Sequence, residues 1–272
     1  MPNHDALILA ALKEDMPQGD ISSMYLFQNE MSSGRFLAKE DGVLSGILIA
    51  KRTFELIDHR TVFTPFKQDG DAIKKGEVIA TVEGKTTSLL MAERVALNFM
   101  QRMSGIASKT AQFVKETEGT TCEILDTRKT TPLLRALEKQ AVRDGGGTNH
   151  RFSLSDMVML KDNHLKASGS IARAVKEVRE RVGNNIKIEV EVESLEMLEE
   201  ALQTDCDVIM LDNMSTPLMR QAVEINQGRK KLEASGNMTL SRIREVAATG
   251  VDYISVGALT HSFTSLDISL KF

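Results

Sequence analysis

Cysteine is scarce in this sequence: only Cys122 and Cys206 occur among 272 residues. Two cysteines are too few for a disulfide framework in a chain of this size, so a reducing, cytoplasmic setting is the simpler interpretation. Long apolar runs are absent too, since none reaches the roughly 18 residues that a membrane span needs. The apolar stretch 6–12 is short and leads into acidic residues, which argues against a signal peptide. We therefore expect no membrane association.

An excess of positive charge is also missing. The chain has 34 Lys and Arg against 38 Asp and Glu, a net charge of -4, which argues against a nucleic-acid binder that depends on bulk positive charge. The segment 128–151 reverses this balance with six basic and two acidic residues. Such a run is usually a solvated helix face. Here, however, several of its charges fall beside predicted strand ends, which favours a binding role.

The second half of the chain alternates short apolar runs with helical patterns. Runs at 186–192, 208–211, 232–234 and 253–256 follow earlier ones at 122–125 and 157–160. The residues at the ends of the last four runs, Glu191, Asp212, Ser235 and Gly257, are spaced by 21, 23 and 22 residues. This alternation is typical of β/α units with a parallel sheet, and six units suggest a closed or nearly closed barrel. Ser194 and Thr239 are the expected N-caps of two of the helices, and either Gly169 or Ser170 opens a third.

The first hundred residues show a different pattern. We expect a helix at 6–13, strands at 34–39 and 77–83, and a long helix at 88–102 that Ser104 and Gly105 interrupt. This predicts an α+β domain at 1–110 beside a barrel domain at 111–261. The sequence leaves the place of residues 262–272 open, with packing on the first domain as one option.

The predicted strand ends carry the candidate chemistry, because β/α barrels place their active sites there. Ser235 and Gly236 precede a helix, and Gly257 follows the last strand, so both segments suit a phosphate group. Glu191 and Asp212 on separate strands could share Mg²⁺. Arginine and lysine donors suit anionic groups, carboxylates above all; they are accompanied by one histidine, and the set is Arg128, Lys129, His150, Arg151 and Lys161. A magnesium-bound sugar phosphate and a carboxylated partner fit this inventory.

These residues lie in motifs along nearly the whole chain that resemble the quinolinate phosphoribosyltransferase family, also called carboxylating nicotinate-nucleotide pyrophosphorylases. The motifs include Glu-Arg-Val-Ala-Leu-Asn at 93–98, Asp-Thr-Arg-Lys-Thr at 126–130, Gly-Gly-Gly-Thr-Asn-His-Arg at 145–151 and Lys-Asp-Asn-His at 161–164. They continue with Glu-Val-Glu-Val at 189–192, Leu-Asp-Asn at 211–213, Glu-Ala-Ser-Gly at 233–236 and Ser-Val-Gly-Ala-Leu-Thr-His at 255–261. Asn237 departs from the family, where a further glycine is common.

The resemblance implies an N-terminal α/β sandwich domain and a C-terminal, incomplete β/α barrel. It implies transfer of phosphoribosyl from phosphoribosyl pyrophosphate to quinolinate, with release of pyrophosphate and carbon dioxide and formation of nicotinate mononucleotide for NAD biosynthesis. It also implies a homodimer in which Arg102 of one subunit reaches a quinolinate carboxylate in the other. No organic cofactor is expected beside Mg²⁺, and neither nucleic acid nor membrane is an expected partner.

The resemblance assigns individual roles as well. Arg128, His150 and Arg151 would bind the quinolinate carboxylates, and Lys161 would lie between quinolinate and the sugar phosphate. Lys129 would contact the phosphoribosyl substrate. Glu191 and Asp212 would hold magnesium and the ribose hydroxyls, while Ser235, Gly236 and Gly257 would bind the 5′-phosphate. Lys129, Lys161, Glu191 and Asp212 form the expected catalytic set.

Three alternatives stay open on the sequence alone. One is a related phosphoribosyltransferase for another heterocyclic acid, which includes the molybdenum-locus relatives of this family. A second is a Schiff-base aldolase with Lys161 as the nucleophile, which would require a lysine with a lowered pKa. A third is a phosphate-ligand sensor without catalysis.

Overall fold

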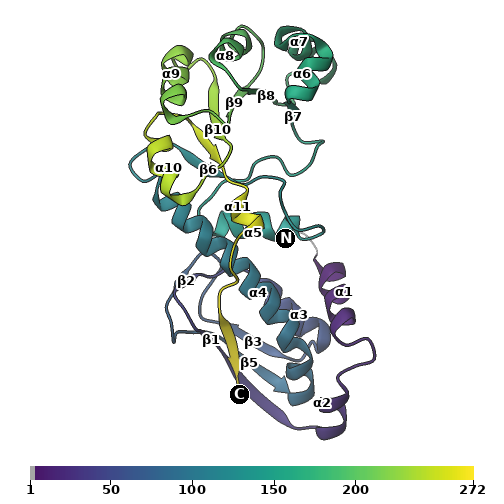
Figure 1. The fold of residues 1–272 in the computed structure, drawn as a ribbon. Coiled ribbons are helices and arrows are strands. Elements are labelled where there is room, and N and C mark those ends of the chain that lie inside the picture. Colours follow the sequence, from purple (N-terminus) through teal and green to yellow (C-terminus); the bar gives the residue numbers. More distant parts are fainter. Residues whose placement is uncertain (1–3) are drawn as a thin grey trace. The chain divides into compact units, whose positions relative to one another are not determined.

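The computed structural model describes residues 4–272, so the first three residues of the predicted domain 1–110 lie outside it. The chain forms two compact units (Figure 1). The first contains the residues up to Lys109 together with Ala136–Gly146 and Phe263–Phe272, and the second contains Thr110–Arg135 and Gly147–Ser262. The predicted domains 1–110 and 111–261 differ from these units chiefly in one respect: residues 136–146 belong to the first unit. Within residues 4–272, no helix has both the length and the apolar character needed to cross a membrane.

A four-stranded antiparallel sheet in the order β12-β1-β5-β3 organises the first unit. Its strands are β1 (Met31–Ala38), β3 (Val62–Pro65), β5 (Val78–Lys85) and β12 (Ile268–Lys271). Strand β12 pairs with β1 so that Ile268 lies opposite Ala38, which ties residues 268–271 to this sheet. Alternate residues of β1 are buried, as expected for a sheet with one face on a core.

The core of the first unit lies between this sheet and the helices α3 (Ile47–Ile57) and α4 (Thr86–Lys115). Phe36, Phe54 and Phe63 meet there with ring centroids 5.5 to 6.0 Å apart, in tilted and edge-on arrangements that aromatic rings favour. The remaining elements are α1 (Asp5–Asp15), α2 (Ile21–Leu26), β2 (Gly42–Val43), β4 (Ala72–Ile73) and α5 (Arg135–Asp144), of which α5 has half of its residues buried.

Helix α4 corrects one expectation. Ser104 and Gly105 do not interrupt it, since the helix continues unbroken for 30 residues. Gly105 is required for packing rather than for a break, because a Cβ there would collide with the backbone carbonyl of Thr264. The Ser104 hydroxyl donates a hydrogen bond of 3.1 Å to the carbonyl oxygen of Ser45 and is buried. Both small residues therefore allow close approach of neighbouring backbone.

The second unit is a parallel six-stranded sheet in the order β6-β11-β10-β9-β8-β7. Its strands are β6 (Glu123–Leu125), β7 (Val158–Leu160), β8 (Ile188–Val192), β9 (Val208–Asp212), β10 (Lys231–Ser235) and β11 (Tyr253–Ser255). Each lies within two residues of its predicted bounds. Among the described residues β7 pairs only with β8, while β6 pairs with β11 and has one isolated bridge from Leu125 to Thr148. The end strands β6 and β7 do not pair with each other, so the barrel is incomplete. The predicted fold class, an α/β chain with an incomplete β/α barrel, is confirmed.

Helices follow the strands of the second unit, most of them on the outer side of the sheet (Figure 1). They are α6 (Asp162–Ser168), α7 (Ile171–Val182), α8 (Leu195–Leu202), α9 (Thr216–Asn226), α10 (Leu240–Ala247) and α11 (Ala258–His261). The side chain of Ser194 caps α8 as predicted, and that of Ser170, one of the two options, caps α7; they accept from the N–H groups of Met197 and Arg173. Thr239 occupies the N-cap of α10 but makes no capping hydrogen bond with its side chain.

Candidate active site

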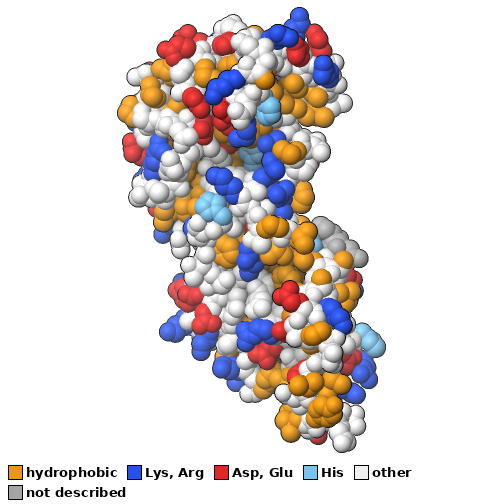
Figure 2. All heavy atoms as spheres, turned by 45° about the vertical axis from the view of Figure 1, so that its right-hand side comes forward, with side chains coloured by type: hydrophobic (Ala, Val, Ile, Leu, Met, Phe, Trp, Pro, Cys, Tyr) orange, Lys and Arg blue, Asp and Glu red, His pale blue; other side chains and the backbone are white. Residues whose placement is uncertain are grey.

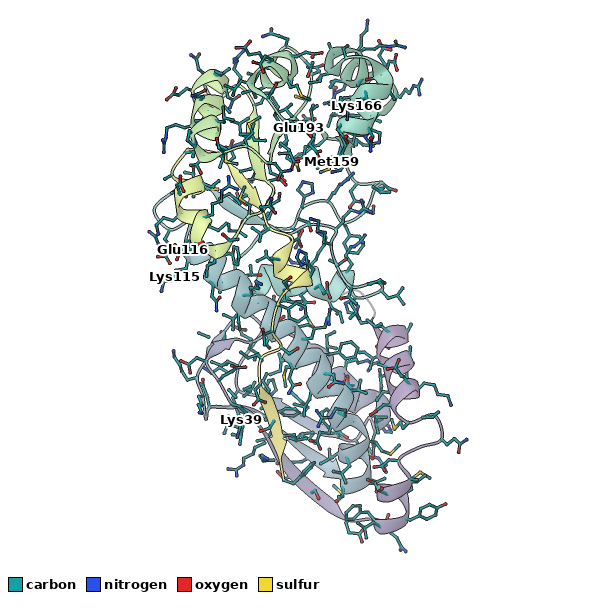
Figure 3. The ribbon with its side chains drawn as sticks, viewed as in Figure 1. Lys39, Lys115, Glu116, Met159, Lys166 and Glu193 are labelled. Carbon is teal, nitrogen blue, oxygen red and sulfur yellow. The ribbon has the colours of Figure 1, made fainter. Side chains whose placement is uncertain are left out.

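A cavity of about 810 Å³ opens at the carboxyl ends of the parallel strands in the second unit. It brings together every candidate residue of that unit: Arg128, Lys129, His150, Arg151, Lys161, Glu191, Asp212, Ser235, Gly236 and Gly257. Figure 2 shows Lys, Arg and His side chains near acidic ones on the face of this unit that it presents. Met159, labelled in Figure 3, adds an apolar surface from β7. The cavity is thus lined by both signs of charge.

Strand register explains why the acidic residues meet. Glu191 on β8 and Glu233 on β10 both lie opposite Met210 on β9, so the three side chains share one face of the sheet. Asp212 and Ser235 lie opposite each other two residues further along their strands, nearer the open end. Because side chains alternate between faces, Glu189 shares the face of Glu191 one layer deeper.

Lys161 and Glu191 form the closest pair of opposite charges at the cavity. The Lys161 Nζ donates to Glu191 Oε2 at 2.8 Å, and Glu191 is 9% exposed. Asp212 accepts from the Asn213 side chain at 2.6 Å and also faces the cavity. Two carboxylates on neighbouring strands offer the oxygen donors that Mg²⁺ prefers, so this donor set fits the expected ion.

The loop after β10 turns sharply at a glycine beside the cavity. Gly236 has a φ of +92°, and a Cβ there would collide with Asn213. Arg242 on α10 donates to the carbonyl oxygens of Gly236 and Met214, at 3.2 and 2.7 Å. These bonds hold both carbonyls, while Gly236 and Asn237 line the cavity. Glycine at such a turn lets a phosphate approach the backbone closely.

The segment after β11 closes the same side of the cavity. A Cβ at Gly257 would lie 2.9 Å from Lys129 Cδ and 3.1 Å from His261 Nε2. The Thr260 hydroxyl donates to the carbonyl oxygen of Lys129 at 2.8 Å. Gly257 therefore makes room for the Lys129 side chain, and Thr260 fixes the Lys129 backbone.

Arg151 is held by two contacts of its guanidinium group. Nη1 donates to the carbonyl oxygen of Met157 at 3.1 Å, and Nη2 lies 3.4 Å from the sulfur of Met159. Burial and the nearby charge of Arg128 lower the pKa of Arg151, which still remains protonated because its ordinary value is so high. Arg151 is therefore a fixed positive charge at the cavity.

A buried trio lies beneath this charge. His150 Nε2 is 3.0 Å from Glu189 Oε2 and 3.3 Å from Glu233 Oε2, and the two glutamates are 0% and 1% exposed. The remaining carboxylate oxygen of each glutamate, Oε1, is buried without a hydrogen-bond partner. Burial and the charge of Glu233 raise the pKa of Glu189. The ligand atoms of the trio lie within 4.8 Å of one another.

The protonation of His150 is set by contacts on both ring nitrogens. Burial lowers its pKa, but the hydrogen bonds and charges of Glu189 and Glu233 outweigh this effect and raise it. The backbone N–H of Arg151 donates to Nδ1 at 2.8 Å, and Nδ1 can accept only while it carries no hydrogen. This hydrogen bond therefore favours the neutral ring and acts to lower the pKa of His150. This pattern assigns the ring hydrogen to Nε2, which faces the two carboxylates.

Asp126 fixes the main chain of the same loop. It is fully buried after β6 and accepts from the His150 N–H at 2.9 Å and from the Asn149 side chain at 2.6 Å. Sequence reasoning had not singled out Asp126, Glu189 or Glu233. The available signal was alternation, since Glu189 precedes Glu191 by two residues on a buried strand and Glu233 precedes Ser235 in the same way.

Arg102 is the one candidate in the first unit, whereas the cavity residues all belong to the second. Its Nε and Nη2 atoms donate to Glu138 Oε1 at 3.1 and 2.5 Å, and Glu138 is fully buried. Its guanidinium carbon lies 4.8 Å from the centre of the Phe263 ring, a cation–π arrangement. Helix α5 thus orients Arg102 through Glu138.

Comparison with known proteins identifies the family. Residues 20–104 match the quinolinate phosphoribosyl transferase N-terminal domain, and residues 106–271 match its C-terminal domain. The chain belongs to the quinolinate phosphoribosyltransferase family. A Bacillus subtilis relative named "Probable nicotinate-nucleotide pyrophosphorylase [carboxylating]" is 46% identical over 94% of this chain and 89% of its own length. The chloroplastic nicotinate-nucleotide pyrophosphorylase [carboxylating] of Arabidopsis thaliana is 44% identical over 99% and 83%.

Solved structures of this family share the fold. NadC from Streptococcus pyogenes matches with a TM-score of 0.96 at 44% identity, covering 99% of this chain and 95% of its own. The nicotinate-nucleotide pyrophosphorylase from Ehrlichia chaffeensis matches with a TM-score of 0.95 at 40% identity, covering 100% and 99%. The resemblance deduced from the sequence motifs is therefore confirmed across both domains of the quinolinate phosphoribosyltransferase family.

Proposed function

We propose that this chain transfers phosphoribosyl from phosphoribosyl pyrophosphate to quinolinate, with loss of carbon dioxide, and so makes nicotinate mononucleotide for NAD biosynthesis. The observation that carries the proposal is one cavity that combines fixed cations with a carboxylate pair and a glycine turn, in a chain of this family. We also propose a cytoplasmic setting, which is in keeping with two buried cysteines that form no disulfide.

The proposed site has a phosphate side and an acceptor side. Ser235, Gly236 and Gly257 would bind the 5′-phosphate, with Lys129 beside them. Arg128 and Arg151 would hold the two carboxylates of quinolinate, with Lys161 between the acceptor and the sugar. His150, which the family resemblance also assigns to the carboxylates, lines the same cavity and has its Nε2 beside Glu189 and Glu233. Fixed charges of this kind would place the pyridine nitrogen in line with the anomeric carbon.

Glu191 and Asp212 would hold Mg²⁺ and the ribose hydroxyls. When bound, the ion would offset the negative charge that develops on pyrophosphate. The Lys161 side chain, kept in place by Glu191, would also stabilise the negative charge on the leaving pyrophosphate. The Lys161 Nζ is engaged by Glu191 Oε2 at 2.8 Å, whereas the Schiff-base alternative needs this amine free to attack a carbonyl carbon.

The chemistry proceeds in two steps. The pyridine nitrogen forms a bond to the anomeric carbon as the bond from that carbon to pyrophosphate breaks. The ring is then a pyridinium, which accommodates the electron pair left when the adjacent carboxylate departs as carbon dioxide, and a proton replaces that carboxylate. The positive ring itself serves as the electron sink, so the reaction requires no organic cofactor.

We further propose that the active form is a homodimer. Arg102 would enter the cavity of the neighbouring subunit and bind a carboxylate there. The ion pair with Glu138 and the Phe263 ring support this role, because they hold the guanidinium group in one orientation while it remains 28% exposed.

A pyrophosphate-release assay tests the proposed function. Purified protein is supplied with phosphoribosyl pyrophosphate and magnesium, and quinolinate is compared with nicotinate in parallel, with carbon dioxide measured alongside. Turnover with quinolinate and equimolar carbon dioxide is expected. Turnover with nicotinate alone would move the protein to another acceptor, and folded protein that is silent with both would contradict the proposal.

A further inference from the structure

Two glutamates occupy positions in the barrel interior where aliphatic side chains are the rule. The interior of a β/α barrel is usually filled by layers of Val, Ile and Leu. Here Glu189 and Glu233 are buried, and their neighbours on the same strands are Ile188, Val190 and Leu232. Buried carboxylates with an unpartnered oxygen cost stability, and apolar residues of similar volume would often be as stable. This cost indicates a role other than stability.

The direction of the contacts suggests what that role is. Both carboxylates meet His150 Nε2, and the other ring nitrogen of His150 accepts from the Arg151 backbone N–H. The His150 ring is therefore held at both nitrogens: at Nε2 by carboxylates of the barrel interior, and at Nδ1 by the backbone of the cavity loop. Asp126 holds the His150 backbone independently of the ring.

We propose that Glu189 and Glu233 are positioning residues for the acceptor: they hold the His150 ring through Nε2, and the ring in turn fixes Arg151 at the cavity. The inference rests on the proposed function, since it concerns binding of the acceptor's carboxylates. Glu233 lines the cavity with only 1% of its surface exposed, and Glu189 lies one layer deeper, so both are proposed to act on the acceptor indirectly. Their effect reaches it through His150 and Arg151, which both line the cavity, whereas the proposed phosphate loop at Gly236 is held separately by Arg242.

Kinetics of Glu233→Gln and Glu189→Gln test the proposal. Each variant keeps the side-chain shape but removes the charge that holds Nε2–H, so the KM for quinolinate should rise by about tenfold or more through misplacement of Arg151. The KM for phosphoribosyl pyrophosphate should change less than about twofold, because its proposed contacts lie elsewhere. Glu193→Gln is the matched control: it removes the same charge at an exposed position just after β8, labelled in Figure 3.

A double-mutant cycle separates positioning from a general structural role. If Glu233 acts through the ring, Glu233→Gln should add little further loss of quinolinate affinity in a His150→Ala background. Additive losses, or equal rises in both KM values, would overturn the inference. So would an unchanged KM for quinolinate in both single variants.

A measurement on unmodified protein keeps the inference testable should the variants not fold. In ¹⁵N-resolved spectra, His150 should show a downfield, slowly exchanging hydrogen on Nε2 and an Nδ1 that accepts a hydrogen bond. A rapidly exchanging Nε2 hydrogen, or a stoichiometric metal ion bound by the trio in its place, would overturn the inference. These spectra do not depend on turnover, so failure of the proposed function in the quinolinate assay is distinguishable from failure of this inference.

Discussion

Replacement of Gly105 by alanine sets two effects of known sign against each other. Alanine in a helix interior is more favourable than glycine by about 0.8–1.0 kcal/mol, so helix propensity alone predicts a more stable protein. The structure predicts the opposite, because the new Cβ would collide with the Thr264 carbonyl and approach the Ser265 Cα to 2.9 Å. These are backbone atoms of a segment that the Leu266 N–H fixes to the Gln101 carbonyl at 3.0 Å, so they cannot swing aside.

Overpacking of a filled site costs about 1–3 kcal/mol, and contact with fixed backbone belongs at the upper end of that range. After the gain in propensity is subtracted, Gly105→Ala should lower the free energy of unfolding by about 2 kcal/mol. Urea unfolding followed by circular dichroism measures the change. Gln112→Ala compared with Gln112→Gly, at an exposed position of the same helix, gives the Ala–Gly propensity difference without a packing change. A higher urea midpoint for Gly105→Ala than for the unmodified protein would refute the packing argument.

Three further predictions concern the cavity, the dimer and the first unit. Gly236→Ala should raise the KM for phosphoribosyl pyrophosphate by about tenfold or more, since its Cβ would displace Asn213 beside the proposed phosphate loop; an unchanged KM would rule out this loop as the phosphate site. Arg102→Ala should weaken quinolinate use more than phosphoribosyl pyrophosphate use, and mixing it with Lys161→Ala protein should restore some activity; mixed dimers that stay inactive would exclude a shared site. Burial raises the pKa of Asp69 to about 6, so the folded state binds more protons than the unfolded state and stability falls as pH rises from about 4 to 6. Asp69→Asn should therefore weaken the fall in urea midpoint between about pH 4.5 and 7, and an equal fall in both proteins would contradict this assignment.

The barrel strands could be predicted well because their signals are local. Each is a short apolar run that ends in a polar or glycine residue, and such runs at regular spacing identify β/α units. The cavity residues followed from the rule that strand ends meet at one edge. The same reasoning failed at Ser104 and Gly105, because the partner that needs a small residue there, Thr264, lies about 160 residues further along the chain.

The buried glutamates show a different limit of sequence reasoning. A charged residue in a strand is ordinarily assigned to the solvent side, and only three-dimensional register shows that Glu189 and Glu233 meet His150 inside the barrel. Pairing of β10 with β9 and of β9 with β8 brings the two glutamates together from strands more than 40 residues apart in the chain. Alternation along each strand was visible, but the neighbour across the sheet was not.

The pairing of β12 with β1 has a consequence for synthesis of the chain. A ribosome completes every strand and helix of the second unit before it reaches residues 268–271, which form the outer strand of the first unit's sheet. Since domains generally fold as units during synthesis, the unit that is begun first is finished last. While the second unit is being translated, the edge of β1 that later pairs with β12 has no partner strand. Such an edge can pair with strands of other chains.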